Sequence, residues 1–165
     1  MDKQETWQSR LPALALTAVR IVFGIWWLSQ FSWKPPPTFG CPNGGLCEWL
    51  DKEIQYPLIP LYGQFVQAIA RPLAIPFGYL AFLTETALGV SFILGLFTRI
   101  GGLVGTLWSL NLLIGLVAIP GETFWYYLSM ILLNVLYFGV GSRGQLALDN
   151  RLRLPDWLSF WASKE

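Results

Sequence analysis

The chain has 165 residues, of which 54% are apolar and 13% are charged, against about 25% charged residues in an ordinary soluble domain. This balance predicts one integral membrane domain over residues 1–165, with the lipid bilayer as its surroundings. Eleven Lys and Arg offset ten Asp and Glu, which excludes a basic surface for nucleic acid. Histidine is absent and there are two cysteines, so no resident metal or haem is expected.

Four apolar stretches are long enough to be transmembrane helices, which need about 20 residues because lipid offers the backbone no hydrogen-bond partners. They cover residues 11–31, 73–97, 100–119 and 122–140. The predicted fold is therefore an all-α bundle of four transmembrane helices. A long external loop, residues 32–72, joins the first two spans, and a tail, residues 141–165, follows the last.

The positive charges outside the spans predict the orientation. One side holds Lys3, Arg10, Arg99, Arg143, Arg151, Arg153 and Lys164, and the other holds Lys34, Lys52 and Arg71. The excess of Lys and Arg predicts that both termini are cytoplasmic, in a cell inner membrane or a thylakoid-type membrane. Aromatic residues are expected at the outer surface (Trp33, Trp49, Tyr56, Tyr62) and in an inner interfacial helix that begins at Pro155 (Trp157, Phe160, Trp161).

Four polar residues lie inside the predicted spans: Arg20, Glu85, Asn111 and Asn134. At 1.5 Å per residue, Arg20, Glu85 and Asn111 lie about 14, 18 and 17 Å from the inner ends of their spans. Because a lone charge in the bilayer is costly, Arg20 and Glu85 are expected to pair. The pair either forms a pocket for a ligand headgroup or a proton, or it only locks two helices together. Both asparagines are expected to make hydrogen bonds between helices.

Two glycines of the third span, Gly101 and Gly105, predict a close helix contact. In the external loop, Cys41 and Cys47 flank a turn-forming Asn-Gly-Gly and can form a disulfide. That pair is either a structural staple or a redox-active site. The stretch from Lys34 to Pro37 is expected to be extended, either as a stiff exit from the first helix or to hold Lys34 where an anion would meet it.

Three motifs in chain order resemble the DoxX/DoxD superfamily of four-helix membrane proteins. The first is Arg20-x3-Gly24-x9-Lys34, and the second is Glu85-x3-Gly89 followed by Leu94-Gly95-Leu96-Phe97-Thr98-Arg99. The third is Gly139-x-Gly141-Ser-Arg143-Gly144, running to Leu148-Asp149. The long outer loop with its cysteines looks closer to the DoxD branch, whose name-giving members are the small subunit of thiosulfate:quinone oxidoreductase.

The resemblance implies a quinone-linked membrane subunit that oxidises thiosulfate or another sulfur species at its outer face, with the quinone as a diffusible substrate. Arg20, Glu85 and Lys34 are then the candidate catalytic residues, and Arg20, Glu85 and Asn111 the candidate quinone-binding residues. Arg99 and Asp149 also match the motifs. An alternative is an accessory subunit of a larger respiratory or photosynthetic membrane complex, and other membrane subunits are expected partners in either case. A small-solute transporter is a third, weaker interpretation.

Overall fold

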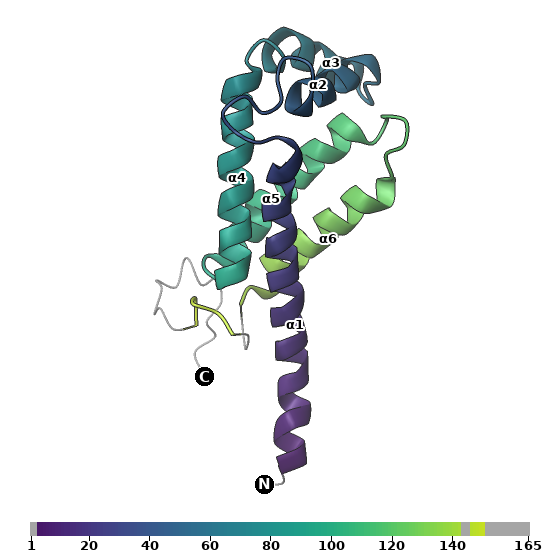
Figure 1. Cartoon of the computed structure of the whole chain (residues 1–165). Coiled ribbons are helices and arrows are strands. Elements are labelled where there is room, and N and C mark those ends of the chain that lie inside the picture. Colours follow the sequence, from purple (N-terminus) through teal and green to yellow (C-terminus); the bar gives the residue numbers. More distant parts are fainter. Residues whose placement is uncertain (1–2, 143–145, 151–165) are drawn as a thin grey trace.

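The computed structural model describes residues 3–142 and 146–150, and all regular structure in these residues is helical. The helices α1 and α4 run lengthwise, α5 and α6 run obliquely to them, and α2 and α3 lie over one end (Figure 1). At the opposite end, the N-terminal half of α1 extends beyond the other described helices. The elements are α1 (Lys3–Ser29), a 3₁₀ turn (Gln30–Trp33), α2 (Gly45–Gln55), α3 (Pro60–Phe65), a π-helical turn (Val66–Ala70), α4 (Ala74–Leu94), α5 (Thr98–Leu116) and α6 (Phe124–Val140).

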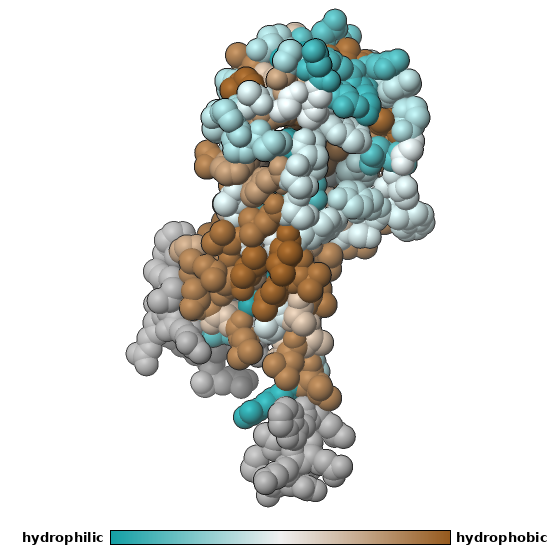
Figure 2. All heavy atoms as spheres, in the orientation of Figure 1, coloured by the Kyte–Doolittle hydropathy of each residue, from teal (hydrophilic) through white to brown (hydrophobic). Residues whose placement is uncertain are grey.

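Three helices are long and apolar enough to cross a membrane: Arg10–Trp33, Ala74–Leu94 and Thr98–Leu116. The prediction of an all-helical fold suited to a bilayer is confirmed for the described residues. The fourth predicted span, residues 122–140, corresponds to α6, an apolar helix of 17 residues. At 1.5 Å per residue α6 is about 26 Å long, slightly less than the roughly 30 Å of a hydrocarbon core. Figure 2 shows apolar residues gathered along the helices and polar ones around α2 and α3.

The segment predicted as a long loop, residues 32–72, contains α2, α3 and the π-helical turn. The expectation of an extended stretch after Lys34 was wrong, because the chain turns at residues 36–43. Phe39 explains this turn. Its backbone N–H donates to the carbonyl of Pro35 at 2.9 Å, and its fully buried ring packs on α4 where Gly78 leaves room. Burial of this ring therefore folds the segment back onto the bundle.

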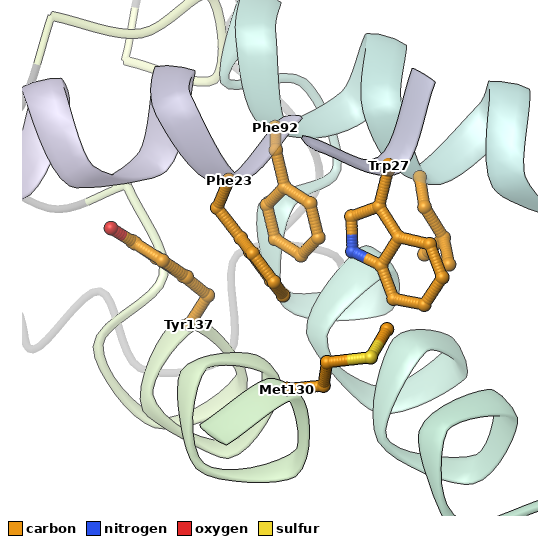
Figure 3. Packing of buried hydrophobic residues seen from close by; sticks show 6 residues of the cluster. Phe23, Trp27, Phe92, Met130 and Tyr137 are labelled. Carbon is orange, nitrogen blue, oxygen red and sulfur yellow. The ribbon is translucent and has the colours of Figure 1, made fainter. Parts of the chain in front are cut away.

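The main core is aromatic and joins three helices (Figure 3). Phe23 of α1 contacts Phe92 of α4 at 5.1 Å between ring centroids, and Phe92 contacts Tyr137 of α6 at 5.5 Å. Trp27 and Met130 are buried in the same cluster. The hydroxyl of Tyr137 donates to the carbonyl of Leu16 at 2.9 Å, which ties α6 to α1.

Glycines set how closely the helices approach. A Cβ atom at Gly24 would lie 2.8 Å from the carbonyl oxygen of Gly89, so α1 and α4 are in backbone contact there. A Cβ atom at Gly102 would overlap the backbone of Phe138 and lie 2.7 Å from the carbonyl oxygen of Asn134, so α5 and α6 are equally close. The two glycines predicted for close packing also lie at contacts, Gly101 against Ser91 and Gly105 against Asn134.

We expect Gly102→Ala to lower the free energy of unfolding by about 1 to 3 kcal/mol, because backbone atoms of α6 cannot move aside as a side chain can. Gly139→Ala is the matched control, since a Cβ atom there meets nothing within 4 Å. The measurement is thermal unfolding of the purified protein in detergent. Equal midpoints for the two variants would contradict a close contact between α5 and α6.

Candidate functional site

A cavity of about 630 Å³ lies at the end of the long helices that α2 and α3 cover. Its size is within the range of about 300 to 1,000 Å³ that is usual for small-molecule pockets. Its wall is largely apolar and aromatic, with a few polar groups, as such pockets are. The aromatic residues in the wall are Trp33, Trp49, Tyr62, Phe65, Phe77, Trp108, Tyr126 and Tyr127. The charged residues in the wall are Lys34, Glu53, Glu85 and Glu122.

Lys34 and Glu85 form a buried ion pair in the cavity wall. The Nζ of Lys34 lies 2.6 Å from the Oε1 of Glu85, and the two residues are 5% and 1% exposed. The 3₁₀ turn at the end of α1 carries Lys34 inward, and its Nζ also lies 4.6 Å from the ring centroid of Trp33. Neither charge could stay here alone, because an uncompensated buried charge costs several kcal/mol. Lys34 is therefore part of the wall instead of an exposed anion contact.

The expected pair between Arg20 and Glu85 was wrong. Arg20 is fully buried, and its Nε donates to the carbonyl of Phe92 at 2.8 Å. Phe92 is seven residues from Glu85 along α4, which is about 10 Å. The contact of Gly24 with Gly89 fixes this register, so Arg20 meets the end of α4 while Glu85 faces the end of α1. The depth estimate failed because it counted from residue 11, whereas the N-terminal half of α1 extends past the end of α4.

Arg20, Arg99 and Asp149 organise the end of the bundle opposite the cavity. The Asp149 carboxylate accepts hydrogen bonds from the backbone N–H groups of Phe97 (2.8 Å) and Thr98 (3.1 Å), so it caps the start of α5. The Nη2 of Arg20 donates to the carbonyl of Leu146 at 2.6 Å, and the Nη2 of Arg99 donates to the carbonyl of Gly139 at 3.2 Å. These side chains bind backbone groups, which supports a structural role.

Several expected features lie outside the described residues. They are Arg143 and Gly144 of the third motif, the cations Arg151, Arg153 and Lys164, and the interfacial helix that begins at Pro155.

The two asparagines of the predicted spans have different surroundings. Asn111 lines the cavity, and its Oδ1 accepts a hydrogen bond of 3.2 Å from the hydroxyl of Tyr62 in α3. The Nδ2 of Asn134 donates to the Oγ of Ser109 at 3.1 Å, which is a hydrogen bond between α6 and α5. The structure therefore brings Asn111 to the same cavity as Glu85 and leaves Asn134 in the packed core.

Sequence reasoning missed Glu53 as a site residue. This residue of α2 is 8% exposed, and a Cβ atom at Gly115 would lie 3.0 Å from its carboxyl carbon, so the carboxyl group packs on α5. Burial raises the pKa of Glu53 to about 7, and the neighbouring hydroxyl of Tyr62 partly opposes this rise. The signal was present in the sequence, because Cys47, Leu50 and Glu53 recur every third residue and share one face of a helix.

Glu53 predicts a pH-dependent stability. Its pKa in the folded protein lies above the ordinary 4.5, so its stabilising contribution is complete below about pH 4.5 and is lost as the pH rises through about 7. Between about pH 4.5 and about pH 7, the free energy of unfolding of the wild type should fall by about 3 kcal/mol relative to that of Glu53→Gln. Midpoints of thermal unfolding measured for both proteins between about pH 5 and about pH 8 test this. Curves that stay parallel would show that Glu53 is not buried as described.

A disulfide joins Cys41, in the turn before α2, to Cys47, in the first turn of α2. Cys47 is 1% exposed and belongs to a small apolar cluster with Leu50 and Val66. The Nη1 of Arg71 donates to the Sγ of Cys47 at 3.2 Å, and the Nε of Arg71 lies 2.6 Å from the Oδ1 of Asp51. This cation was not expected beside the cysteines. The burial of Cys47 favours the staple, because a redox-active sulfur needs access to its substrate.

Replacing both cysteines, as Cys41→Ala with Cys47→Ala, should lower the free energy of unfolding by about 2 kcal/mol, as estimated for a loop this short. Thermal unfolding measures the loss. Reductant should lower the midpoint of the wild type to a similar value and leave the variant unchanged. In protein taken from its native membrane, alkylation of both thiols without reductant would rule out the staple.

Two polar atoms in the cavity wall are buried without a partner. They are the Oε2 of Glu85 and the Nε1 of Trp108, for which the described part of the chain provides no hydrogen bond. The indole of Trp108 lies near the Glu85 carboxyl group. Glu85 and Trp108 therefore interact with each other in the wall, in a geometry poorer than that of a good hydrogen bond.

Comparisons of the chain with protein-family models, with curated proteins and with solved structures found no match. The family resemblance in the motifs therefore rests on the motif residues themselves, and the cavity is interpreted from its own chemistry.

Proposed function

We propose that this chain is a membrane protein of the DoxX/DoxD type that binds the headgroup of a quinone in the cavity and takes part in quinone-linked oxidation of thiosulfate or a similar sulfur anion. The observation that carries the proposal is the buried pair of Lys34 and Glu85 in the wall of a largely apolar cavity. Both residues belong to the motifs that resemble this superfamily, and here they meet at one site.

The chemistry of the wall suits a quinone ring. Aromatic side chains such as Trp108 and Phe77 offer flat apolar surfaces, while Asn111, Tyr62 and Glu85 offer hydrogen-bonding groups for ring oxygens. The apolar helices suit a lipid bilayer, where a ligand with an isoprenoid tail is already concentrated. A headgroup in this cavity would lie beneath α2 and α3, at one end of the spans.

The reaction needs electrons and protons to balance. Two thiosulfate anions that join through a new sulfur–sulfur bond release two electrons. These electrons, with two protons, reduce one quinone to one quinol. Glu53 suits the proton supply, since its carboxyl group borders the cavity and its pKa of about 7 leaves it partly protonated near neutral pH. Lys34 compensates the charge of Glu85 while protons move nearby.

We also propose that α6 is the fourth span. Phe124, Trp125 and Tyr126 begin this helix and suit the membrane interface, where aromatic rings lengthen the effective span. The cavity end, with α2 and α3, would then face outward. The end where α1 extends, with Arg10 and Arg99, would face the cytoplasm, in keeping with the positive-inside rule.

The test is purification of the full-length chain from its native membranes in mild detergent, with mass spectrometry of bound quinones and associated proteins. The wild type should retain a quinone. Ala81→Phe should lose at least nine-tenths of it, because Ala81 is buried in the cavity wall and a phenyl ring would fill the space. Val90→Phe is the control, since Val90 lies on the same helix but is 42% exposed.

Equal quinone recovery from wild type and Ala81→Phe would contradict binding in this cavity. Recovery of the wild type as a stoichiometric part of a large respiratory or photosynthetic complex, without a quinone of its own, would instead make it an accessory subunit.

A further inference from the structure

We propose that α3 and the π-helical turn lie inside the edge of the hydrocarbon layer at the covered end of the bundle, with their exposed apolar side chains in contact with lipid. The partner of this surface is the bilayer itself, through the acyl chains just below the headgroups of one leaflet. The cover of the cavity is then part of the membrane domain and does not lie in the aqueous phase.

The segment between Glu53 and Arg71, residues 54–70, contains no charged residue. Leu61 of this segment is 74% exposed. The other large aliphatic or phenyl side chains exposed in it are those of Leu58, Ile59, Phe65 and Ile69. A contiguous exposed apolar surface is rare on a soluble protein and marks contact with a membrane or a partner.

The exposed side chains of the segment separate into two faces. Leu61, Phe65 and Ile69 follow one another at intervals of four residues, which is the spacing of one helix face. Gln64 and Gln67 are also exposed, are uncharged and lie on another face. A helical segment of this kind lies in the plane of a membrane interface, with its apolar face about 5 to 10 Å into the boundary between headgroups and acyl chains.

Two contacts place α3 beside the neighbouring spans. The ring centroid of Phe65 lies 6.4 Å from that of Phe77, which belongs to the first turn of α4. The hydroxyl of Tyr62 donates to the Oδ1 of Asn111 at 3.2 Å, and Asn111 lies more than one turn before the end of α5. Because α5 runs obliquely to α4, the two helices diverge at the covered end, and α3 lies where they diverge (Figure 1).

The helix α4 indicates where the hydrocarbon layer ends. Its 21 residues are about 32 Å long, close to the roughly 30 Å of a hydrocarbon core, so its start lies near one boundary. The ion pair of Arg71 with Asp51 comes just before this start and suits the headgroup level. Since α3 meets α4 within its first turn, α3 lies at the same boundary.

Exposed apolar side chains continue from this segment onto both spans. Leu73 and Ile75 are exposed at the start of α4, and Leu107 and Leu110 are exposed on α5, beside Asn111. The spans suit a bilayer, so the apolar face of α3 extends a surface that already faces lipid. Phe65 belongs to the cavity wall and is also exposed, so the cavity borders the bilayer at this ring.

The test is fluorescence quenching of the full-length protein in phosphatidylcholine vesicles. A bimane label is attached to Leu61→Cys without reductant, which keeps the disulfide of Cys41 and Cys47 closed. Phosphatidylcholine with a nitroxide close to the headgroup should quench this label by about half or more, because the label lies in the upper acyl region. Iodide on both sides of the vesicles should quench it weakly.

Matched labels at other exposed positions are the controls. A label on Glu48→Cys of α2 should be quenched by iodide and little by the nitroxide lipid, since Glu48 is charged and exposed. A label on Gln67→Cys, on the other face of the same segment, should be quenched more by iodide than the label at Leu61.

Two results would overturn lipid contact. A label at Leu61 that iodide quenches as strongly as the label at Glu48 would place α3 in water. A label at Leu61 protected from both quenchers would show that a second copy of the chain or another subunit covers this face. Neither result bears on the ligand of the cavity, which the recovery of quinone from wild type and Ala81→Phe tests separately.

A pair of charged variants gives a second measurement without a label. Leu61→Asp should lower the midpoint of thermal unfolding in the vesicles by about 3 °C or more, because its short side chain puts a charge among acyl chains. Gln64→Asp should leave the midpoint nearly unchanged, since Gln64 lies on the other face. Equal midpoints for the two variants would contradict insertion of α3.

Discussion

The buried ion pair between Lys34 and Glu85 joins the end of α1 to the middle of α4, and the arrangement of the covered end depends on it. Two charges out of water are stable only together, so the 3₁₀ turn after α1 must bring Lys34 inward at this one position. The position of Lys34 fixes where the next segment starts. The chain turns at Phe39, and α2 follows and packs over the helix ends. The cavity is the space that remains between this cover and the three helices α4, α5 and α6.

The two ends of the long helices are built on different chemistry. At the covered end, the charged side chains of Glu53 and Glu85 lie around a cavity, beside Tyr62 and Lys34 respectively. At the other end, Arg20 and Asp149 bind backbone carbonyl and N–H groups where α4 stops and α5 starts. The motif residues thus divide into a group at the cavity and a group that closes a helix turn.

Sequence alone could predict the three helices that are long and apolar enough to cross a membrane, because an uninterrupted apolar run of about 20 residues has few stable forms other than a helix in lipid. It could also identify Glu85 and Asn111 as unusual, since polar groups inside a span are costly. Lys34 was expected in the external loop and was a candidate only through the motifs. Their partners could not be derived. Pairing depends on the register of α1 against α4, which the contact of Gly24 with Gly89 sets, and two glycines in apolar helices carry no visible register. The helices α2 and α3 were missed because the segment is rich in Pro and Gly, although the spacing of Cys47, Leu50 and Glu53 was helical.

The docking of residues 146–150 has a bearing on how the protein is made. The N–H groups of Leu148 and Asp149 donate to the carbonyls of Leu94 and Gly95, while the Asp149 carboxylate receives the first N–H groups of α5. The turn between α4 and α5 is thus completed by residues synthesised about fifty positions later. During translation α4 and α5 are therefore made with this turn unsealed, and it can close only after α6 and residues 146–150 have left the ribosome. The turn between α4 and α5 therefore closes late, after residues that follow both of its flanking helices have been synthesised.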